Sequence, residues 1–177
     1  MDLGLISVRY ARALLKASNQ EKQSEQVYVD MQTLAAEYLN VQELSGAIAN
    51  PMLSEEQKLA LLVTAAGSTK CDLTLRFIKL VLKGGRGNIM HFIANSFISQ
   101  YREQNNLIQA KLLTATALKP ESVSKLRRLV ESKTNGNVEF NTAIDPSLIG
   151  GFVLEYDTYR LDASVKRQLT TILSKLK

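Results

Sequence analysis

A glycine-rich segment stands out among the residues that could bind a ligand or take part in a reaction. Residues 83–88, KGGRGN, place three glycines and two cations between two apolar stretches. Glycine-rich loops with cations bind phosphate in motifs such as G-x-x-x-x-G-K-[ST], where the loop joins a strand to a helix. This segment lacks that spacing and follows a helical pattern, which argues against a nucleotide site.

The interval from Gly84 to Gly87 also matches the G-x-x-G loop by which KH domains clamp RNA. Such loops join short helices that are closely flanked by strands, whereas the patterns on both sides here are long and helical. We therefore expect a corner between two helices. Gly84 or Gly85 ends the first helix, and Asn88 caps the second.

The other reactive residue types are too sparse for a recognisable active site. His91 is the single histidine and Cys71 the single cysteine, so an internal disulfide or a Cys/His metal site is out of reach. The lone thiol favours a reducing compartment. Glu55 and Glu56 stand in the first turn of a predicted helix, where carboxylates favour the helix dipole. We expect no catalytic, cofactor-binding or metal-binding residues and a function in binding or assembly.

The elements that position these residues begin with about six helices. Apolar residues recur at helical spacing through the first hundred residues, with no convincing strand. Ser54, with Gln57 three positions later, is typical of a capping box at a helix start. The sequence therefore predicts a six-helix antiparallel bundle over residues 1–105.

The hydrophobic period changes from about 3.6 to 2 residues near residue 105, and the patterns that follow have the order β-α-β-β-β-α. Asp162 is expected to cap a final helix. The residues expected to face the core from that helix are Val165, Leu169, Ile172, Leu173 and Leu176. The fold class is therefore predicted to be mixed, with the helical bundle followed by a small α+β domain, residues 106–177.

Charge distinguishes the two parts. The formal net charge is +5, and residues 106–177 carry 11 Lys and Arg against 7 Asp and Glu. A basic second half can face nucleic acid, anionic lipid or an acidic protein. An RNA-binding protein that uses this half is therefore one candidate, although only four aromatic residues are available there for base stacking: Phe140, Phe152, Tyr156 and Tyr159. The apolar runs are too short for a membrane-spanning helix, and the start of the chain does not read as a signal peptide.

Four motifs keep a common order along nearly the whole chain. They are YARAL at residues 10–14, NP at 50–51 ahead of Lys58, FIKL at 77–80 with GR at 85–86, and DPSLIGGF at 145–152 followed by DASV at 162–165 and Leu169. Together they resemble the delta subunit of bacterial F-type ATP synthase, the counterpart of the mitochondrial oligomycin-sensitivity-conferring protein. One departure is Gly87-Asn88, which stands between the GR pair and the next helix.

The resemblance implies a non-catalytic stator subunit without a cofactor, in which the bundle binds the N-terminal helix of an alpha subunit and the second domain holds the b subunits of the peripheral stalk. It also implies a peripheral position at the cytoplasmic face of the bacterial inner membrane, with membrane and nucleic acid not bound directly. The groove residues we expect on the first and fifth helices are Tyr10, Ala13, Ala17, Arg76, Leu80 and Lys83. The signature residues of the second domain are Asp145, Ser147, Gly150, Gly151, Asp162 and Ser164.

Overall fold

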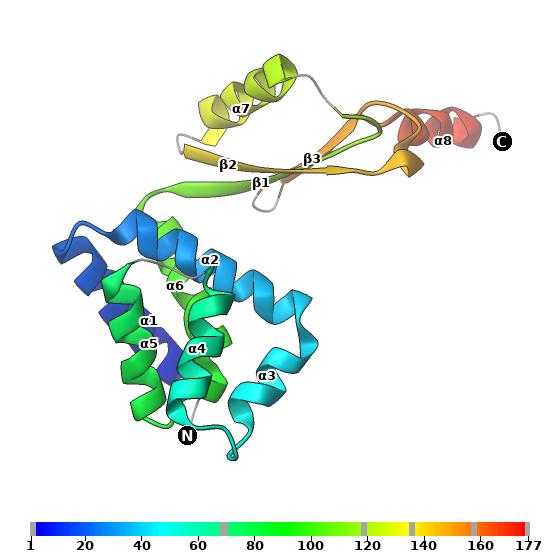
Figure 1. The fold of residues 1–177 in the computed structure, drawn as a ribbon. Coiled ribbons are helices and arrows are strands. Elements are labelled where there is room, and N and C mark those ends of the chain that lie inside the picture. Colours follow the sequence, from blue (N-terminus) through cyan, green and yellow to red (C-terminus); the bar gives the residue numbers. More distant parts are fainter. Residues whose placement is uncertain (1–2, 68–70, 118–119, 135–136, 157–158, 176–177) are drawn as a thin grey trace. The chain divides into compact units, whose positions relative to one another are not determined.

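The computed structural model describes residues 3–67, 71–117, 120–134, 137–156 and 159–175 (Figure 1). The chain divides into two compact units, residues 1–103 and residues 104–177. The first unit is helical and the second combines a sheet with helices, which confirms the predicted fold class.

The described residues of the first unit form six α-helices and a short 3-10 turn. These elements are α1 (Leu3–Gln20), α2 (Ser24–Asn40), α3 (Gln42–Ala49), α4 (Glu55–Ala65), α5 (Asp72–Lys83), η1 (Gly87–Ile89) and α6 (Met90–Gln104). Their apolar stripes converge on one core because each helix buries the residues that recur every three or four positions. The largest fully buried side chains include Leu14, Met31, Leu34, Leu62, Ile78, Met90, Ile93 and Phe97.

The start of α4 is fixed by the predicted capping box. The Gln57 backbone N–H donates to Ser54 Oγ at 3.2 Å, and the Ser54 N–H donates to Gln57 Oε1 at 3.0 Å. Two donors that the first turn leaves unpaired are thereby satisfied.

The glycine-rich segment is a corner between α5 and α6, as predicted. Gly84 N–H donates to the Leu80 carbonyl at 3.1 Å, and Gly85 adopts a φ of +66°, which ends the helix. The predicted cap at Asn88 is wrong, because Asn88 lies inside η1. The corner is tighter than the sequence indicated, since a Cβ on Gly87 would lie 2.8 Å from a Leu82 methyl carbon.

The second unit is a four-stranded sheet with two described helices. Its elements are β1 (Leu107–Thr114), α7 (Pro120–Thr134), β2 (Asn137–Ile144), η2 (Pro146–Leu148), β3 (Phe152–Tyr156), β4 (Tyr159–Asp162) and α8 (Val165–Lys175). The strand order is β2-β1-β3-β4, with β1 parallel to β2 and antiparallel to β3. This arrangement confirms the predicted order of elements.

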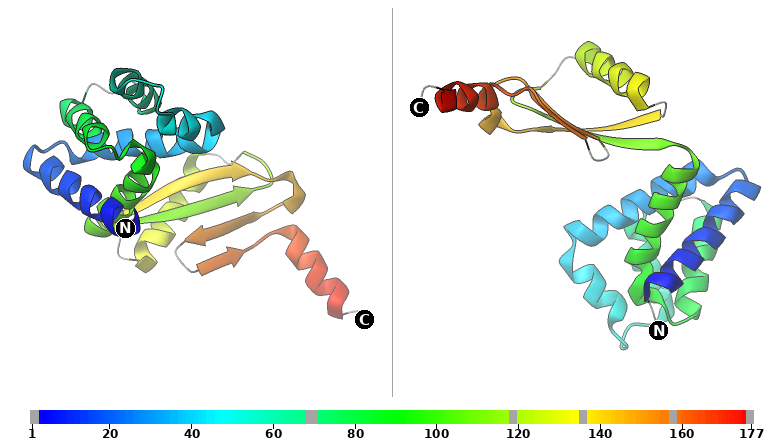
Figure 2. Two further views of the ribbon diagram at one scale, coloured as in Figure 1. Left: turned by 90° about the horizontal axis from the view of Figure 1, so that it is seen from below. Right: turned by 180° about the vertical axis from the view of Figure 1, so that it is seen from behind.

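Helix α7 covers one face of this sheet (Figure 2). Ala110 and Leu112 of β1 point to that face and pack with Val138, Leu154 and the α7 residue Val130. The alternation along β1 places Gln109 and Lys111 on the opposite face, because successive side chains of a strand point to opposite sides.

Helix α8 differs from the sequence prediction. It continues beyond the end of the sheet in Figure 2. Three of the side chains expected to face the core are largely exposed: Leu169 by 47%, Ile172 by 55% and Leu173 by 64%. Val165, at the start of the helix, is partly buried. Leu176 lies outside the described residues. The helix therefore has an apolar face that its own unit leaves uncovered.

Candidate functional site

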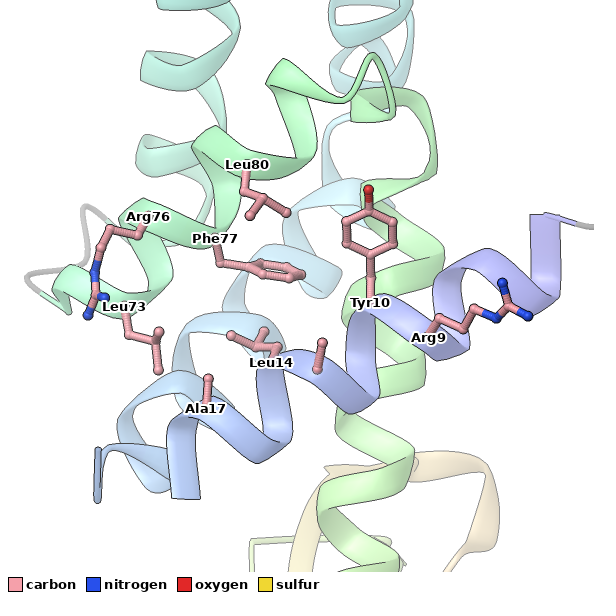
Figure 3. Close-up of a pocket in the computed structure, with 9 residues that line it drawn as sticks. Arg9, Tyr10, Leu14, Ala17, Leu73, Arg76, Phe77 and Leu80 are labelled. Atoms are coloured by element: carbon pink, nitrogen blue, oxygen red, sulfur yellow. The ribbon is translucent and has the colours of Figure 1, made fainter. Parts of the chain in front are cut away.

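An open groove runs between α1 and α5 of the helical unit (Figure 3). Its volume is about 540 Å³. The residues that line it are Arg9, Tyr10, Ala13, Leu14, Ala17, Leu73, Arg76, Phe77 and Leu80.

The helical repeat explains this lining. Positions i, i+3, i+4 and i+7 share a helix face, and Tyr10, Ala13, Leu14 and Ala17 have this spacing on α1. Two of these four are alanines, so the α1 wall is shallow. On α5, Leu73 begins a stripe of the same kind.

The floor of the groove is apolar and its rim is not. Leu14, Leu73 and Phe77 are buried, with at most 8% of each side chain exposed. Leu80, in contrast, is 57% exposed and stands on the wall. An exposed leucine above a closed apolar floor is the arrangement that receives the apolar face of a helix.

One end of the groove is held by Tyr10. Its hydroxyl accepts a hydrogen bond from the Arg86 guanidinium at 2.9 Å. Its ring meets the Phe77 ring edge-on, with the centroids 6.3 Å apart. The corner after α5 is therefore joined to α1 beside the groove.

The other end is held by Arg76. Its guanidinium donates to both carboxylate oxygens of Glu21, at 3.1 and 2.8 Å, and to Asp72 at 2.7 Å. The hydrogen bond from Arg76 to Glu21 is the main cause that raises the pKa of the guanidinium above its ordinary value. Arg76 is thus already engaged, whereas Arg9 has no ion pair with a described residue.

Five of the six residues predicted for this groove line it, namely Tyr10, Ala13, Ala17, Arg76 and Leu80. Lys83 does not, because it turns toward α4 and lines a smaller hollow of about 260 Å³ with Glu55 and Glu56. The sequence reasoning missed Arg9, Leu14, Leu73 and Phe77. Extending the stripes by the full helical repeat would have found the last three.

The signature residues of the second unit form a junction between two turns. Asp145 Oδ1 accepts from the Ser147 N–H at 3.0 Å, and Asp162 Oδ1 accepts from the Ser164 N–H at 3.0 Å and from its hydroxyl at 2.6 Å. The Ser147 hydroxyl lowers the pKa of Asp145, and the Ser164 hydroxyl lowers that of Asp162.

Ser164, rather than the predicted Asp162, caps α8. Its hydroxyl oxygen accepts the Arg167 N–H at 3.2 Å, and its carbonyl accepts the Gln168 N–H at 3.2 Å. Asp162 instead orients this serine. Both residue types are common caps, so the two-residue offset could not be read from the sequence.

The two glycines let the chain before β3 pass closely against the start of α8. Val165 N–H donates to the Gly150 carbonyl at 3.0 Å. A Cβ on Gly151 would lie 2.2 Å from the Ala163 carbonyl oxygen, and its φ is +76°. The junction thus fixes the direction in which α8 leaves the sheet.

Comparison with known protein families identifies the family of this chain. The family model described as ATP synthase delta (OSCP) subunit matches residues 6–176. The chain belongs to this family. It is therefore a non-catalytic subunit of the F-type ATP synthase peripheral stalk.

Curated delta subunits resemble the chain over nearly its whole length. The ATP synthase subunit delta of Phocaeicola vulgatus is 42% identical over 173 residues, which are 97% of this chain and 94% of the relative. That of Parabacteroides distasonis is 39% identical over 176 residues, which are 99% of this chain and 98% of the relative.

A solved structure shares the delta-subunit fold. A chain in the cryo-EM structure of the Toxoplasma gondii mitochondrial ATP synthase hexamer is 22% identical, with a TM-score of 0.64 and 96% of each chain covered. No helix among the described residues is long and apolar enough to cross a membrane.

Family membership selects the stalk function over the RNA-binding alternative. The aromatic residues of the second unit also differ from a stacking platform. Phe140 and Phe152 pack against the core beneath α7, and the Arg127 guanidinium lies 5.8 Å from the centre of the Phe140 ring.

Proposed function

We propose that this chain joins the catalytic head to the membrane-anchored stalk through two separate surfaces. The α1/α5 groove receives an N-terminal helix of an alpha subunit. The second unit holds the end of the b subunits. The protein then sits peripherally at the cytoplasmic face of the bacterial inner membrane, where proton-driven rotation is coupled to ATP synthesis.

The groove between α1 and α5 carries the first part of the proposal. Its closed floor of Leu14, Leu73 and Phe77 and its exposed wall residue Leu80 match an amphipathic helix that inserts an apolar stripe. Arg9 lies on the rim and favours an incoming helix with a carboxylate beside its apolar stripe.

The α1/α5 groove is pre-organised, which also supports its use as a helix-binding site. The Tyr10–Arg86 hydrogen bond holds one end of the groove and the Glu21–Arg76 ion pair the other. A groove whose walls are already fixed loses little conformational entropy when a helix enters. A joint that resists torque requires such tight binding over a large contact, of about 1,600 Å² or more.

The second unit offers a basic surface with an uncovered apolar face on α8. No acidic residue occurs between Val165 and Lys175, where the cations are Lys166, Arg167 and Lys175. Leu169, Ile172 and Leu173 form the exposed apolar face. Such a face suits the acidic end of a coiled-coil stalk.

Calorimetric titration tests the groove. The N-terminal peptide of the alpha subunit from the same organism is titrated into the full-length chain. We expect a Kd at or below about 10⁻⁵ M. Ala13→Arg places a long cation in the groove from an exposed position and is expected to weaken binding at least tenfold. No heat from the unmodified chain at tens of micromolar, about 10⁻⁵ M, would reject the proposal.

A matched pair of variants on α8 tests the stalk surface. Leu173→Asp places a charge on the exposed apolar face, whereas Thr171→Asp places it on the polar side of the same helix. We expect only Leu173→Asp to weaken binding of a fragment that comprises the C-terminal part of a b subunit. Equal binding by the two variants would exclude α8 from the stalk contact.

A further inference from the structure

A second groove, the α2/α4 groove, lies in the helical unit between α2, α3 and α4, which adjoin one another in Figure 1. Its volume is about 540 Å³, equal to that of the α1/α5 groove, with which it shares no lining residue. The α4 wall repeats the helical stripe, since Gln57, Ala60, Leu61 and Thr64 are spaced at i, i+3, i+4 and i+7.

The apolar surface of this second groove is partly uncovered. Val41 is 41% exposed and Leu61 is 38% exposed on opposite walls, whereas Leu44 between them is buried. The capping box at Ser54 fixes the first turn of α4 and with it the position of Gln57. The groove therefore has a closed floor and walls that are set by the fold.

The two grooves differ in the charge of the residues around them. Residues 24–67, which contain α2, α3 and α4, carry six acidic residues and a single cation, Lys58, although the whole chain has a net charge of +5. Glu37 lies in the groove wall itself, and Glu43 precedes the lining residue Leu44. Glu55 and Glu56 instead line the hollow that α4 shares with Lys79 and Lys83 of α5. The α1/α5 groove is lined by arginine instead.

We propose that the α2/α4 groove binds a basic amphipathic helix of another protein. The apolar stripe of that helix covers Val41, Leu44 and Leu61, and lysine or arginine beside the stripe faces Glu37. The two grooves then sort helices by charge, because an acidic helix is repelled by one groove and attracted by the other. This surface is separate from the two joints proposed above.

Two synthetic peptides of about 18 residues, long enough for five helical turns, provide the probe. Both carry the same leucine stripe, one flanked by lysines and the other by glutamates. Fluorescence anisotropy with full-length Ala13→Arg, in which the α1/α5 groove is blocked, gives their Kd values. We expect the lysine peptide to bind at least tenfold tighter, with a preference that shrinks as salt is raised.

The variants Ala60→Arg and Ala13→Arg show which of the two grooves binds the lysine peptide. Both alanines are exposed, and each lines one groove only. We expect Ala60→Arg to weaken binding of the lysine peptide at least tenfold and Ala13→Arg to leave it unchanged. Glu37→Gln retains the shape of the wall and is expected to weaken the same peptide about three- to tenfold, which tests the charge if Ala60→Arg misfolds.

Three outcomes would overturn the proposal. Equal affinity for the two peptides would show that charge does not select the occupant. Loss of lysine-peptide binding in Ala13→Arg but not in Ala60→Arg would place it in the other groove. A concentration-dependent dimer in sedimentation equilibrium that Ala60→Arg abolishes would assign the groove to a second copy of this chain.

Discussion

The Arg86 guanidinium donates a hydrogen bond to the Tyr10 hydroxyl at 2.9 Å, with its central carbon 5.4 Å from the centre of the Tyr10 ring. The two residues are 76 positions apart, and their contact joins α1 to the corner that follows α5. The glycine-rich segment thus presents an arginine to a groove residue instead of a loop to a phosphate.

A double-mutant cycle measures this contact. Arg86→Ala and Tyr10→Phe are each expected to destabilise the chain, and the coupling between them should be about 0.5–1.5 kcal/mol in the free energy of unfolding. Urea unfolding of the four proteins gives the value. Additive effects of the two changes would show that the contact does not hold α1 against the corner.

Gly151→Ala is expected to destabilise the second unit by about 2–5 kcal/mol, because it combines a left-handed backbone with a close approach to a carbonyl oxygen. The hypothetical Cβ lies 2.2 Å from Ala163 O. Gly85→Ala is the control, since its φ is also positive but no atom lies within 4 Å of its Cβ. Hydrogen exchange should show lost protection in β3 and α8 for Gly151→Ala alone. An equal loss of unfolding free energy in Gly85→Ala and Gly151→Ala would refute the role of the close approach.

Acid should weaken the junction at Asp162. The Ser164 hydroxyl lowers the pKa of this carboxyl below its ordinary value of 3.8, so the stabilisation is complete above that value. It is lost as the pH falls through the lowered pKa. Asp162→Asn should therefore have a lower urea midpoint than the unmodified chain at pH 6, and the two midpoints should converge at acidic pH. A constant difference down to pH 2 would contradict this account.

Replacement of Tyr38 is expected to raise the stability of the chain. Its hydroxyl is buried without a hydrogen-bond partner among the described residues, and burial raises its pKa to about 12. Tyr38→Phe should stabilise the chain by about 1 kcal/mol, because it removes an unsatisfied polar group and keeps the ring. In the unmodified chain, stability should fall as the pH rises from 10 toward 12, since the unfolded state releases the phenolic proton first. Phenolate absorbance and urea unfolding check both expectations.

The residues of the groove between α1 and α5 could largely be predicted, because the family resemblance points to these two helices and residue spacing then defines the face of each. Tyr10, Ala13 and Ala17 on α1 could be assigned without knowing what lies opposite. Lys83 could not, since its place depends on where α4 packs against α5, and the spacing of residues along α5 contains no information on that neighbour.

The exposed face of α8 was outside the reach of sequence reasoning for a different reason. An amphipathic pattern is the same whether the apolar face packs against the chain's own core or against a partner. The spacing of Leu169 and Leu173 therefore led to the prediction that they are core residues. The backbone conformation at Ile149 could not be predicted from the sequence either. Its φ of +66° is unusual for a β-branched residue, and nothing in its side chain encodes it.

The central place of β1 in the sheet has a consequence for the order in which the chain folds during synthesis. Leu107 pairs with Asn137, and Ala110 pairs with Tyr156, so β1 is made well before either of its neighbours. The contacts of the helical unit lie within residues 1–103 and form earlier and more locally. The nascent β1 strand therefore stays without its full set of neighbours until about forty further residues have been added, and during that interval its unpaired edges are open to aggregation.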